Sequence, residues 1–255
     1  PANFYRIEMQ CYRFHCKNFK KGRRMKLAIM QPYLFPYIGY YQLISAVDKF
    51  IILDDVNYIM RGWINRNRRL VNGEEHIFTA PIVKASQNKK ITECKLADGP
   101  WKEKLIKTIE LSYKKAPYYN QVYDFIVDSL CYPDTNLSGW LTYQIKKTCE
   151  FLEIKTVIYN SSGTYQNNDL KGQERLIDIC KKEKADQYIN PIGGTGLYDK
   201  NIFKNNSIRL NFLKSKAISY KQFNSTYIPS LSIIDVMMFN EKEIITCFLD
   251  EYELL

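Results

Sequence analysis

The stretch KLAIMQPYLFPYIGYYQLISAVDKFIILDD, residues 26–55, decides the fold. Its two apolar runs, residues 26–31 and 49–54, have the length and composition of strands. Between them, Gly39 permits a close turn, and the apolar spacing from Ile38 to Ile44 suits a helix packed back on the first strand. A strand, loop, helix and strand in this order predict the opening unit of a nucleotide-binding type of α/β domain. In such domains ligands bind beyond the carboxyl ends of the strands.

The rest of the chain continues this alternation. Asn72-Gly73 is a strong hairpin signal between expected strands at 68–71 and 76–82. Asp98 is expected to cap a helix that carries Trp101 and Tyr113, and Pro117 to open the next one. The other expected strands are 91–96 (an edge strand), 156–159, 187–190 and 208–212, and the other expected helices are 137–152, 171–185, 230–240 and 241–255. The pattern predicts a single α/β domain over residues 25–255, with a Rossmann-like, nucleotidyl-transferase-type core, a mainly parallel sheet, a β-hairpin insertion and additional helices.

Residues 1–24 are expected to be a non-native extension produced by an over-extended gene prediction. They show no periodicity, and they end in KKGRR, which a purine-rich ribosome-binding sequence would encode, directly before Met25. The alternative is a basic arm for a membrane or nucleic acid. The segment holds seven Lys or Arg and one Glu, a net +6 of the chain's formal +10, which leaves +4 for the remainder. Local positive charge should therefore carry any anion binding.

Composition limits the classes of function. No apolar run reaches the length of a membrane span, so no membrane span and a cytoplasmic location are expected. His76 is the only histidine after residue 24, which excludes a histidine-based zinc site, and no metal site is assigned. The five cysteines after residue 24 form no C-x-x-C pair and are expected to be reduced thiols: Cys94, Cys131, Cys149, Cys180 and Cys247.

The loop after the first strand is the first candidate site. In nucleotidyl-transferase-like domains a His-x-Gly-His pattern follows this strand and faces the nucleotide phosphates. Here Tyr37-Ile38-Gly39-Tyr40 takes the corresponding place, and a neutral phenol does not supply an imidazolium's charge. We expect this loop to shape a pocket, the alternative being that its tyrosines only pack on the core. The predicted substrate-binding residues of this loop are Gln31, Tyr33, Tyr37, Gly39 and Tyr40.

Residues 54–69 form the densest polar cluster and the second candidate site. Asp54 and Asp55, at the end of a strand, could act as a base, bind sugar hydroxyls or hold a divalent cation, and we predict them as catalytic. Arginine side chains suit a phosphate or carboxylate, and an indole ring suits a sugar or base. The alternative is a solvated salt-bridge network, first of all for Arg69. The predicted substrate-binding residues here are Asn57, Arg61, Trp63, Asn65, Arg66 and Arg68.

Ser161, in the polar turn after strand 156–159, is predicted as the opposite wall of a cleft, because small polar residues let a ligand approach the backbone. The glycines of residues 191–196 could do the same but match no phosphate fingerprint. Ser232 or Ser230, at the start of the helix at 230–240, is expected to be its cap.

Three long motifs, QPYLFPYIGYYQLI, LDDVNYIMRGWINRNR and PSLSIIDVMMFN, resemble the WbqC-like protein family. The resemblance covers residues 25 to about 253. Proteins of this family are associated with gene clusters for O-antigen and other surface polysaccharides. The resemblance therefore implies that pathway, but no catalytic assignment. A lysine is expected at position 60 from the family pattern, and Met60 departs from it.

Two functions remain open at this point. The first is a transferase that places an acyl or aminoacyl group on a nucleotide-activated amino sugar. The second is a protein that binds a nucleotide or sugar nucleotide without catalysis. A nucleic-acid partner is not expected, because most of the positive charge lies in residues 1–24; an RNA binder is the third possibility. No cofactor and no oligomeric state are assigned.

Overall fold

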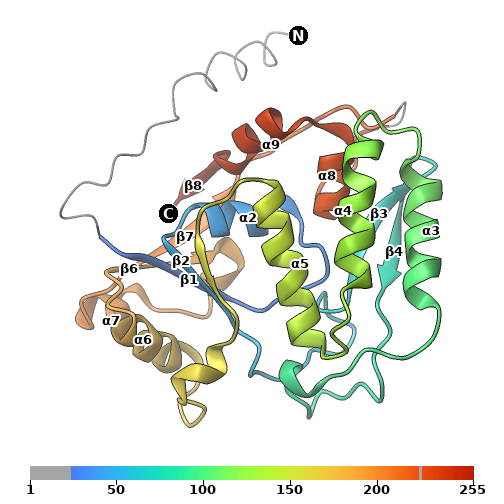
Figure 1. Ribbon diagram of the computed structural model, residues 1–255. Coiled ribbons are helices and arrows are strands. Elements are labelled where there is room, and N and C mark those ends of the chain that lie inside the picture. Colours follow the sequence, from blue (N-terminus) through green and yellow to red (C-terminus); the bar gives the residue numbers. More distant parts are fainter. Residues whose placement is uncertain (1–23, 224–225) are drawn as a thin grey trace.

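A computed structural model describes residues 24–223 and 226–255. Its centre is a six-stranded sheet in which only the last strand is antiparallel to its neighbour. The strands, in spatial order, are β5 (Val157–Tyr159), β2 (Lys49–Ile52), β1 (Lys26–Met30), β6 (Gln187–Pro191), β7 (Arg209–Ser215) and β8 (Tyr252–Leu254). The chain thus builds one side of β1 first and then the other side (Figure 1).

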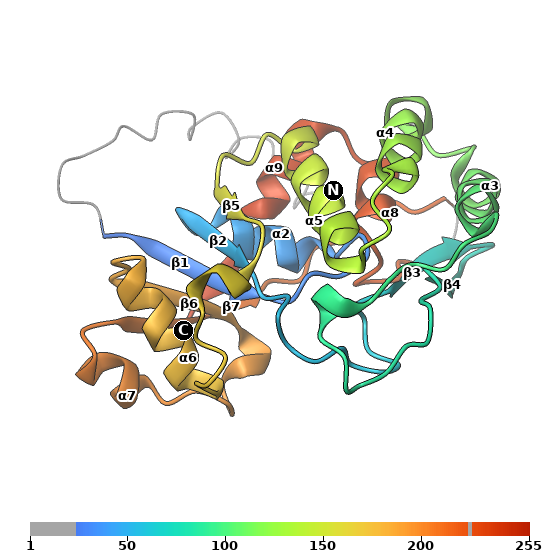
Figure 2. The ribbon, with the colours of Figure 1, turned by 60° about the horizontal axis from the view of Figure 1, so that its bottom comes forward.

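Helices cover both faces of the sheet (Figure 2). Alternate side chains of β1 and β2 explain this arrangement, since a strand points successive residues to opposite faces. Leu27, Ile29 and Ile51 are buried with α6 (Gly172–Lys182) and α7 (Lys200–Asn205). The alternate residues of the same two strands point to the opposite face and are buried in a larger core. The helices of that face are α2 (Ile38–Ser45), α4 (Tyr119–Cys131), α5 (Leu137–Phe151), α8 (Ile233–Phe239) and α9 (Lys242–Leu249). The sheet is the middle of three layers.

A separate two-stranded hairpin lies beside these layers. It comprises β3 (Arg66–Val71) and β4 (Glu74–Thr79), and Asn72 and Gly73 turn between them with φ of 50° and 85°. Positive φ at both turn residues is the geometry that favours Asn-Gly. Its partner helix, α3 (Trp101–Tyr113), packs against β3, and Tyr113 Oη accepts a hydrogen bond from the Leu70 backbone N–H at 2.9 Å. The predicted α/β fold with a mainly parallel sheet, a hairpin and additional helices is confirmed.

Several local predictions are wrong. Residues 91–96 form the 3₁₀ turn η1 (Ile91–Glu93) and two isolated bridges instead of a strand, because their backbone partners come from three different segments. Asp98 does not cap α3, which begins after Pro100. The final helix stops at Leu249, and β8 then pairs with β7 at the edge of the sheet. The short helix α7 was not predicted.

The cysteines differ from expectation at one position. Cys247 on α9 is disulfide-bonded, so the prediction of five reduced thiols is wrong at this position. Cys94, Cys131, Cys149 and Cys180 are free. Burial raises the pKa of the Cys180 thiol to about 12 and also raises that of Cys149, so both stay protonated. These two cysteines pack as small apolar residues.

Candidate functional site

The loop that leaves β1 is held by side chains from two distant segments. The Asn67 amide on β3 donates to the backbone oxygens of Leu34 at 2.9 Å and Phe35 at 2.6 Å. Ser232, which caps α8 as predicted, donates from its hydroxyl to the Phe35 oxygen at 2.9 Å. Phe35 has a φ of 39°, a conformation that costs a non-glycine residue energy, and these donors stabilise it. The loop is therefore a rigid part of the sheet edge.

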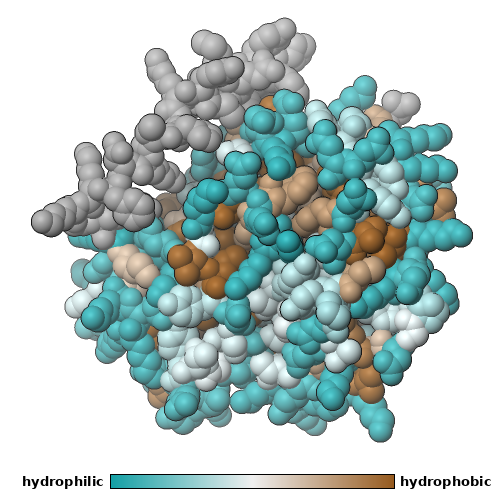
Figure 3. All heavy atoms as spheres, viewed as in Figure 1, coloured by the Kyte–Doolittle hydropathy of each residue, from teal (hydrophilic) through white to brown (hydrophobic). Residues whose placement is uncertain are grey.

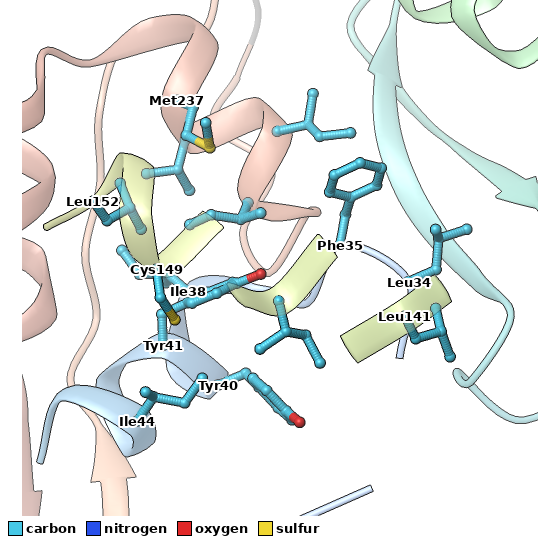
Figure 4. Packing of buried hydrophobic residues seen from close by; sticks show 14 of the residues in the cluster. Leu34, Phe35, Ile38, Tyr40, Tyr41, Ile44, Leu141, Cys149, Leu152 and Met237 are labelled. Atoms are coloured by element: carbon cyan, nitrogen blue, oxygen red, sulfur yellow. The ribbon is translucent and has the colours of Figure 1, made fainter. Parts of the chain in front are cut away.

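The apolar side chains of this loop are buried in the core. Leu34 and Phe35 are fully buried and lie in the same cluster as Leu141 of α5 and Met237 of α8 (Figure 4). Each fully buried side chain of this size stabilises the fold by roughly 1.5–3 kcal/mol relative to exposure. The motif QPYLFPY is thus conformationally fixed by packing and by hydrogen bonds.

Tyrosines fill the start of α2. Tyr33 Oη accepts a hydrogen bond from the Tyr37 backbone N–H at 3.1 Å, and Tyr40 Oη donates to the Gln31 oxygen at 3.0 Å. Burial raises the pKa of Tyr33 and Tyr40 well above the ordinary value, so both phenols are neutral. A Cβ atom on Gly39 would lie 2.5 Å from the Tyr37 ring. The ring therefore covers the first turn of α2, and Gly39 is what allows it to lie there.

Asp54 links three segments at the carboxyl edge of β2. One carboxylate oxygen accepts a hydrogen bond from Ser138 Oγ at 2.6 Å, in the first turn of α5. The other accepts from Ser161 Oγ at 2.6 Å and from the Ser162 backbone N–H at 3.2 Å. Asp54 is only 2% exposed. The structure thus brings together the predicted residues Asp54 and Ser161, and it adds Ser138, which the sequence reasoning missed.

Asp55 forms a buried ion pair with an arginine that the sequence reasoning missed. Arg175 Nη2 on α6 lies 2.6 and 2.5 Å from the two carboxylate oxygens, and Ser162 Oγ also donates to this group. Burial acts to raise the pKa of Asp55, but the hydrogen bonds from Arg175 and Ser162 outweigh it and hold the pKa below the usual value. Arg175 Nε donates to Asn167 Oδ1 at 3.0 Å, which fixes the guanidinium. The signal in the sequence was an arginine on the apolar face of an amphipathic helix.

In the described residues, the predicted arginines form no hydrogen bonds with these two carboxylates. Arg68 pairs with Glu75 at 2.7 Å and donates to the Ser230 oxygen at 3.0 Å. Arg66 donates to the backbone oxygens of Gly62 and Arg61. In the described part of the chain, the exposed Arg61 side chain donates no hydrogen bond. Asp54 and Asp55 are instead bound by serines and Arg175.

An exposed indole connects the arginines. Trp63 is 47% exposed, and the guanidinium carbons of Arg66 and Arg68 lie 5.5 and 5.4 Å from its ring centroid. We call Trp63, Arg66 and Arg68 the platform. A backbone hydrogen bond of 3.0 Å from Leu34 N–H to the Ile64 oxygen ties it to the loop after β1. The platform therefore borders the carboxyl edge of the sheet, and its flat cationic and aromatic faces suit a phosphate next to a ring.

Arg69 was the first residue expected to form a salt bridge if residues 54–69 were only a solvated salt-bridge network. In the described residues it forms none. Its Nε donates to Ser112 Oγ at 3.2 Å, and burial lowers its pKa. Asn65 bonds within the fold, accepting from Tyr58 Oη at 2.7 Å and donating to the Ala80 oxygen at 2.8 Å. Asn57 borders an open cavity of about 420 Å³.

Neither a metal-binding group of side chains nor a membrane-spanning helix is found in the described residues. Within residues 24–223 and 226–255, no three acidic, histidine or cysteine side chains gather in a way that could bind a metal ion. None of the helices in these residues is long and apolar enough to cross a membrane. The face shown in Figure 3 is mostly hydrophilic, and its hydrophobic side chains form separate patches.

The long motifs that build this edge of the sheet agree with the comparison with known families. The sequence model of the WbqC-like protein family matches residues 31–247, which include the β1 loop, the platform and Ser232. The chain belongs to the WbqC-like protein family. This WbqC-like chain is 32% identical over 215 residues to the uncharacterised protein Rv1507c of Mycobacterium tuberculosis, which covers 83% of this chain and 92% of that protein. No solved structure matches the chain.

Proposed function

We propose that this WbqC-like protein is a cytoplasmic transferase of surface-polysaccharide (O-antigen) biosynthesis that places an acyl or aminoacyl group on a nucleotide-activated amino sugar. The observation that carries the proposal is the platform, an exposed indole with two guanidinium groups beside it at the edge of an α/β sheet. An aromatic face stacks on a base or sugar, and guanidinium groups bind the diphosphate between them.

The strand order supports a Rossmann-like core for this activity. Numbered along the chain, the five parallel strands take the spatial order 3-2-1-4-5, which is the order of doubly wound dinucleotide-binding sheets. The order reverses between β1 and β6, and ligands of such sheets bind beyond the carboxyl ends at this reversal. The rigid loop after β1 lies at that position, and the platform borders it.

The proposed roles follow from the hydrogen bonds that are already made. Arg61, Arg66 and Arg68 would hold the diphosphate together, and Arg61 has the most donors left for it, because Arg66 and Arg68 also donate to protein oxygens. Trp63 would stack on the base or sugar. The amine nitrogen would form a bond to the acyl carbon of an activated acyl or aminoacyl donor, and the bond from that carbon to the donor's leaving group would break, with the electron pair departing on the leaving group. Asp54 or Asp55 would take the proton that the amine loses.

The bonds of the two carboxylates also support a positioning role. Asp55 has a lowered pKa and an ion pair with Arg175, so it accepts a proton less readily than an ordinary carboxylate. Asp54 holds Ser161 and Ser162 in place. Turnover of folded Asp54→Asn and Asp55→Asn variants separates the two roles. If the replaced carboxylate is the base, turnover is lost. If it only positions other groups, turnover stays measurable and KM is raised.

Calorimetric titration with UDP-, dTDP- and GDP-linked amino sugars tests the proposal. We expect Trp63→Ala to weaken binding by about five- to 150-fold, since stacking on an aromatic side chain contributes roughly 1–3 kcal/mol. Arg61→Ala should weaken binding and reduce its salt dependence, while Arg209→Ala, an exposed arginine on β7, serves as the matched control. Absence of binding to every sugar nucleotide, or unchanged affinity in Trp63→Ala, would refute the proposal.

A second function is favoured by one observation. The Tyr37 ring lies over Gly39, so it covers the helix start at which nucleotidyl transferases bind phosphate. A protein that binds a sugar nucleotide without reacting would fit this arrangement. Tight binding without any mass change of the sugar nucleotide, in the presence of acyl and aminoacyl donors, would favour this second function.

A further inference from the structure

A cavity beside the carboxyl edge of β2 is separate from the platform residues. It has a volume of about 420 Å³, within the range of roughly 300–1,000 Å³ that is typical of small-molecule sites. The residues that line it come from two loops and are Asn57, Tyr58, Ile59, Met60, Gln87 and Asn88. The first loop begins directly after the Asp54–Asp55 pair, which places the cavity near the proposed reaction site.

The two loops are clamped together. The Tyr58 N–H donates to the Lys89 oxygen at 2.8 Å, and the Ile91 N–H donates to the Val56 oxygen at 2.9 Å. Asn57 lies between these bonds and forms a bridge with Lys90. The cavity walls are thus joined by backbone hydrogen bonds on both sides of Asn57.

Tyr58 and the second loop are also fixed in position. Tyr58 is 4% exposed, and its phenol donates to Asn65 Oδ1 at 2.7 Å, which ties this lining residue to the residue directly before β3. Ser86 organises the second loop by accepting hydrogen bonds from the Asn88 N–H at its hydroxyl, 3.2 Å, and from the Lys89 N–H at its backbone oxygen, 3.2 Å. A prearranged cavity loses little conformational entropy when a ligand binds.

The chemistry of the lining is neutral and amphipathic. Asn57, Gln87 and Asn88 each carry an amide group that can both donate and accept hydrogen bonds. Beside them, Ile59 and Met60 are 51% and 46% exposed and offer apolar surface. Charged groups are absent from this lining, so nothing in it neutralises a charged ligand. Hydroxyl groups that donate and accept, on a ring with apolar C–H faces, match this combination.

We infer that this cavity binds one uncharged pyranose ring of a saccharide, at a subsite separate from the platform. The amides of Asn57, Gln87 and Asn88 hydrogen-bond to its hydroxyls, and Ile59 and Met60 pack against its C–H face. The subsite rests on its own lining, and it deepens the proposed function by supplying a place for a second sugar. The failure of either proposal can be recognised separately, because the two sets of residues do not overlap.

Ligand-detected NMR tests the inference with methyl glycosides of glucose, galactose, mannose, N-acetylglucosamine and N-acetylgalactosamine. We expect at least one to bind in the millimolar range, and each of Asn57→Ala and Gln87→Ala to weaken it by roughly two- to ten-fold, the effect of one lost hydrogen bond. Gln121→Ala, an exposed amide on α4, is the matched control and should leave the affinity unchanged.

Three results would overturn the inference. They are absence of binding by all five glycosides, binding that neither cavity variant weakens, and preferential binding of N-acetylglycine methylamide, which would indicate a peptide ligand. Trp63→Ala distinguishes the two proposals: it should leave glycoside binding intact while weakening sugar-nucleotide binding, and Gln87→Ala should do the reverse.

Discussion

Replacing Arg175 by methionine should destabilise the protein by about 3–5 kcal/mol at pH 7, the cost of removing one partner of a buried ion pair. The two side chains are 8% and 7% exposed, and Arg175 Nη2 contacts both oxygens of Asp55. Methionine retains much of the aliphatic volume but leaves Asp55 buried with only Ser162 as a donor among the bonds described above. For a domain of this size the loss corresponds to a lower Tm by roughly 6–20 °C.

The pH dependence gives the prediction a distinct signature. In the wild type the pKa of Asp55 is lowered on folding, so the ion pair stabilises the protein above the unfolded pKa, about 4, and this stabilisation is lost as the pH falls through the folded pKa. In Arg175→Met, burial should raise the pKa of Asp55 instead. Its charge then destabilises the variant increasingly as the pH rises above about 4. The difference in unfolding free energy between the two proteins should therefore be largest at pH 7, decrease as the pH falls, and become small only below the lowered pKa of Asp55 in the folded wild type.

Urea denaturation followed by circular dichroism at several pH values measures this difference. Asp55→Asn/Arg175→Met removes both charges and should recover most of the lost stability, whereas Arg209→Met, on an exposed arginine, should cost less than about 0.5 kcal/mol. A loss below about 1 kcal/mol in Arg175→Met, or a loss independent of pH, would refute the reasoning.

Three further variants test the packing of the sheet edge by urea denaturation. Asn67→Ala leaves the buried backbone oxygen of Leu34 without its side-chain donor, while the Phe35 oxygen keeps its bond from Ser232, and should cost about 1–3 kcal/mol, with no such loss if the loop is held otherwise. Gly39→Ala should cost about 1–3 kcal/mol through its contact with Tyr37 and become stabilising, by up to about 1 kcal/mol, in a Tyr37→Ala background; the same sign in both would contradict the contact. Asp54→Asn should cost about 1–3 kcal/mol, because the amide accepts at one oxygen only, and the bond that Ser138 or Ser161 donates to the other carboxylate oxygen is replaced by a weaker neutral bond from NH₂ to the hydroxyl; an unchanged Cm would exclude this role.

The elements predicted well are those whose signals are local. The apolar runs of β1 and β2, the Asn72-Gly73 turn and the 3.6-residue spacing of α5 each depend on residues near one another in the chain. Residues 91–96 failed, because alternation over six residues does not show whether a strand partner lies beside them.

The candidate site was predicted in part. Asp54 and Ser161 were predicted in different walls of one cleft. The structure makes β2 and β5 neighbours in the parallel sheet, and the two residues form a hydrogen bond. The predicted arrangement of carboxylates facing Arg61, Arg66 and Arg68 is not seen in their hydrogen bonds. Arg175 lies 120 residues from Asp55 and reaches it only because α6 covers the sheet next to β2.

The α/β class, the strand–loop–helix–strand opening and the family follow from the sequence alone, because period, turn chemistry and motif order are properties of short stretches of chain. Which polar groups meet depends on the tertiary structure. A buried carboxylate must be paired or hydrogen-bonded, but its partner is whichever donor the packed helices bring within about 3 Å. The packing paired Asp55 with Arg175, placed the guanidinium groups of Arg66 and Arg68 beside the exposed Trp63 ring, and formed the cavity beside Asn57 from loops about 30 residues apart.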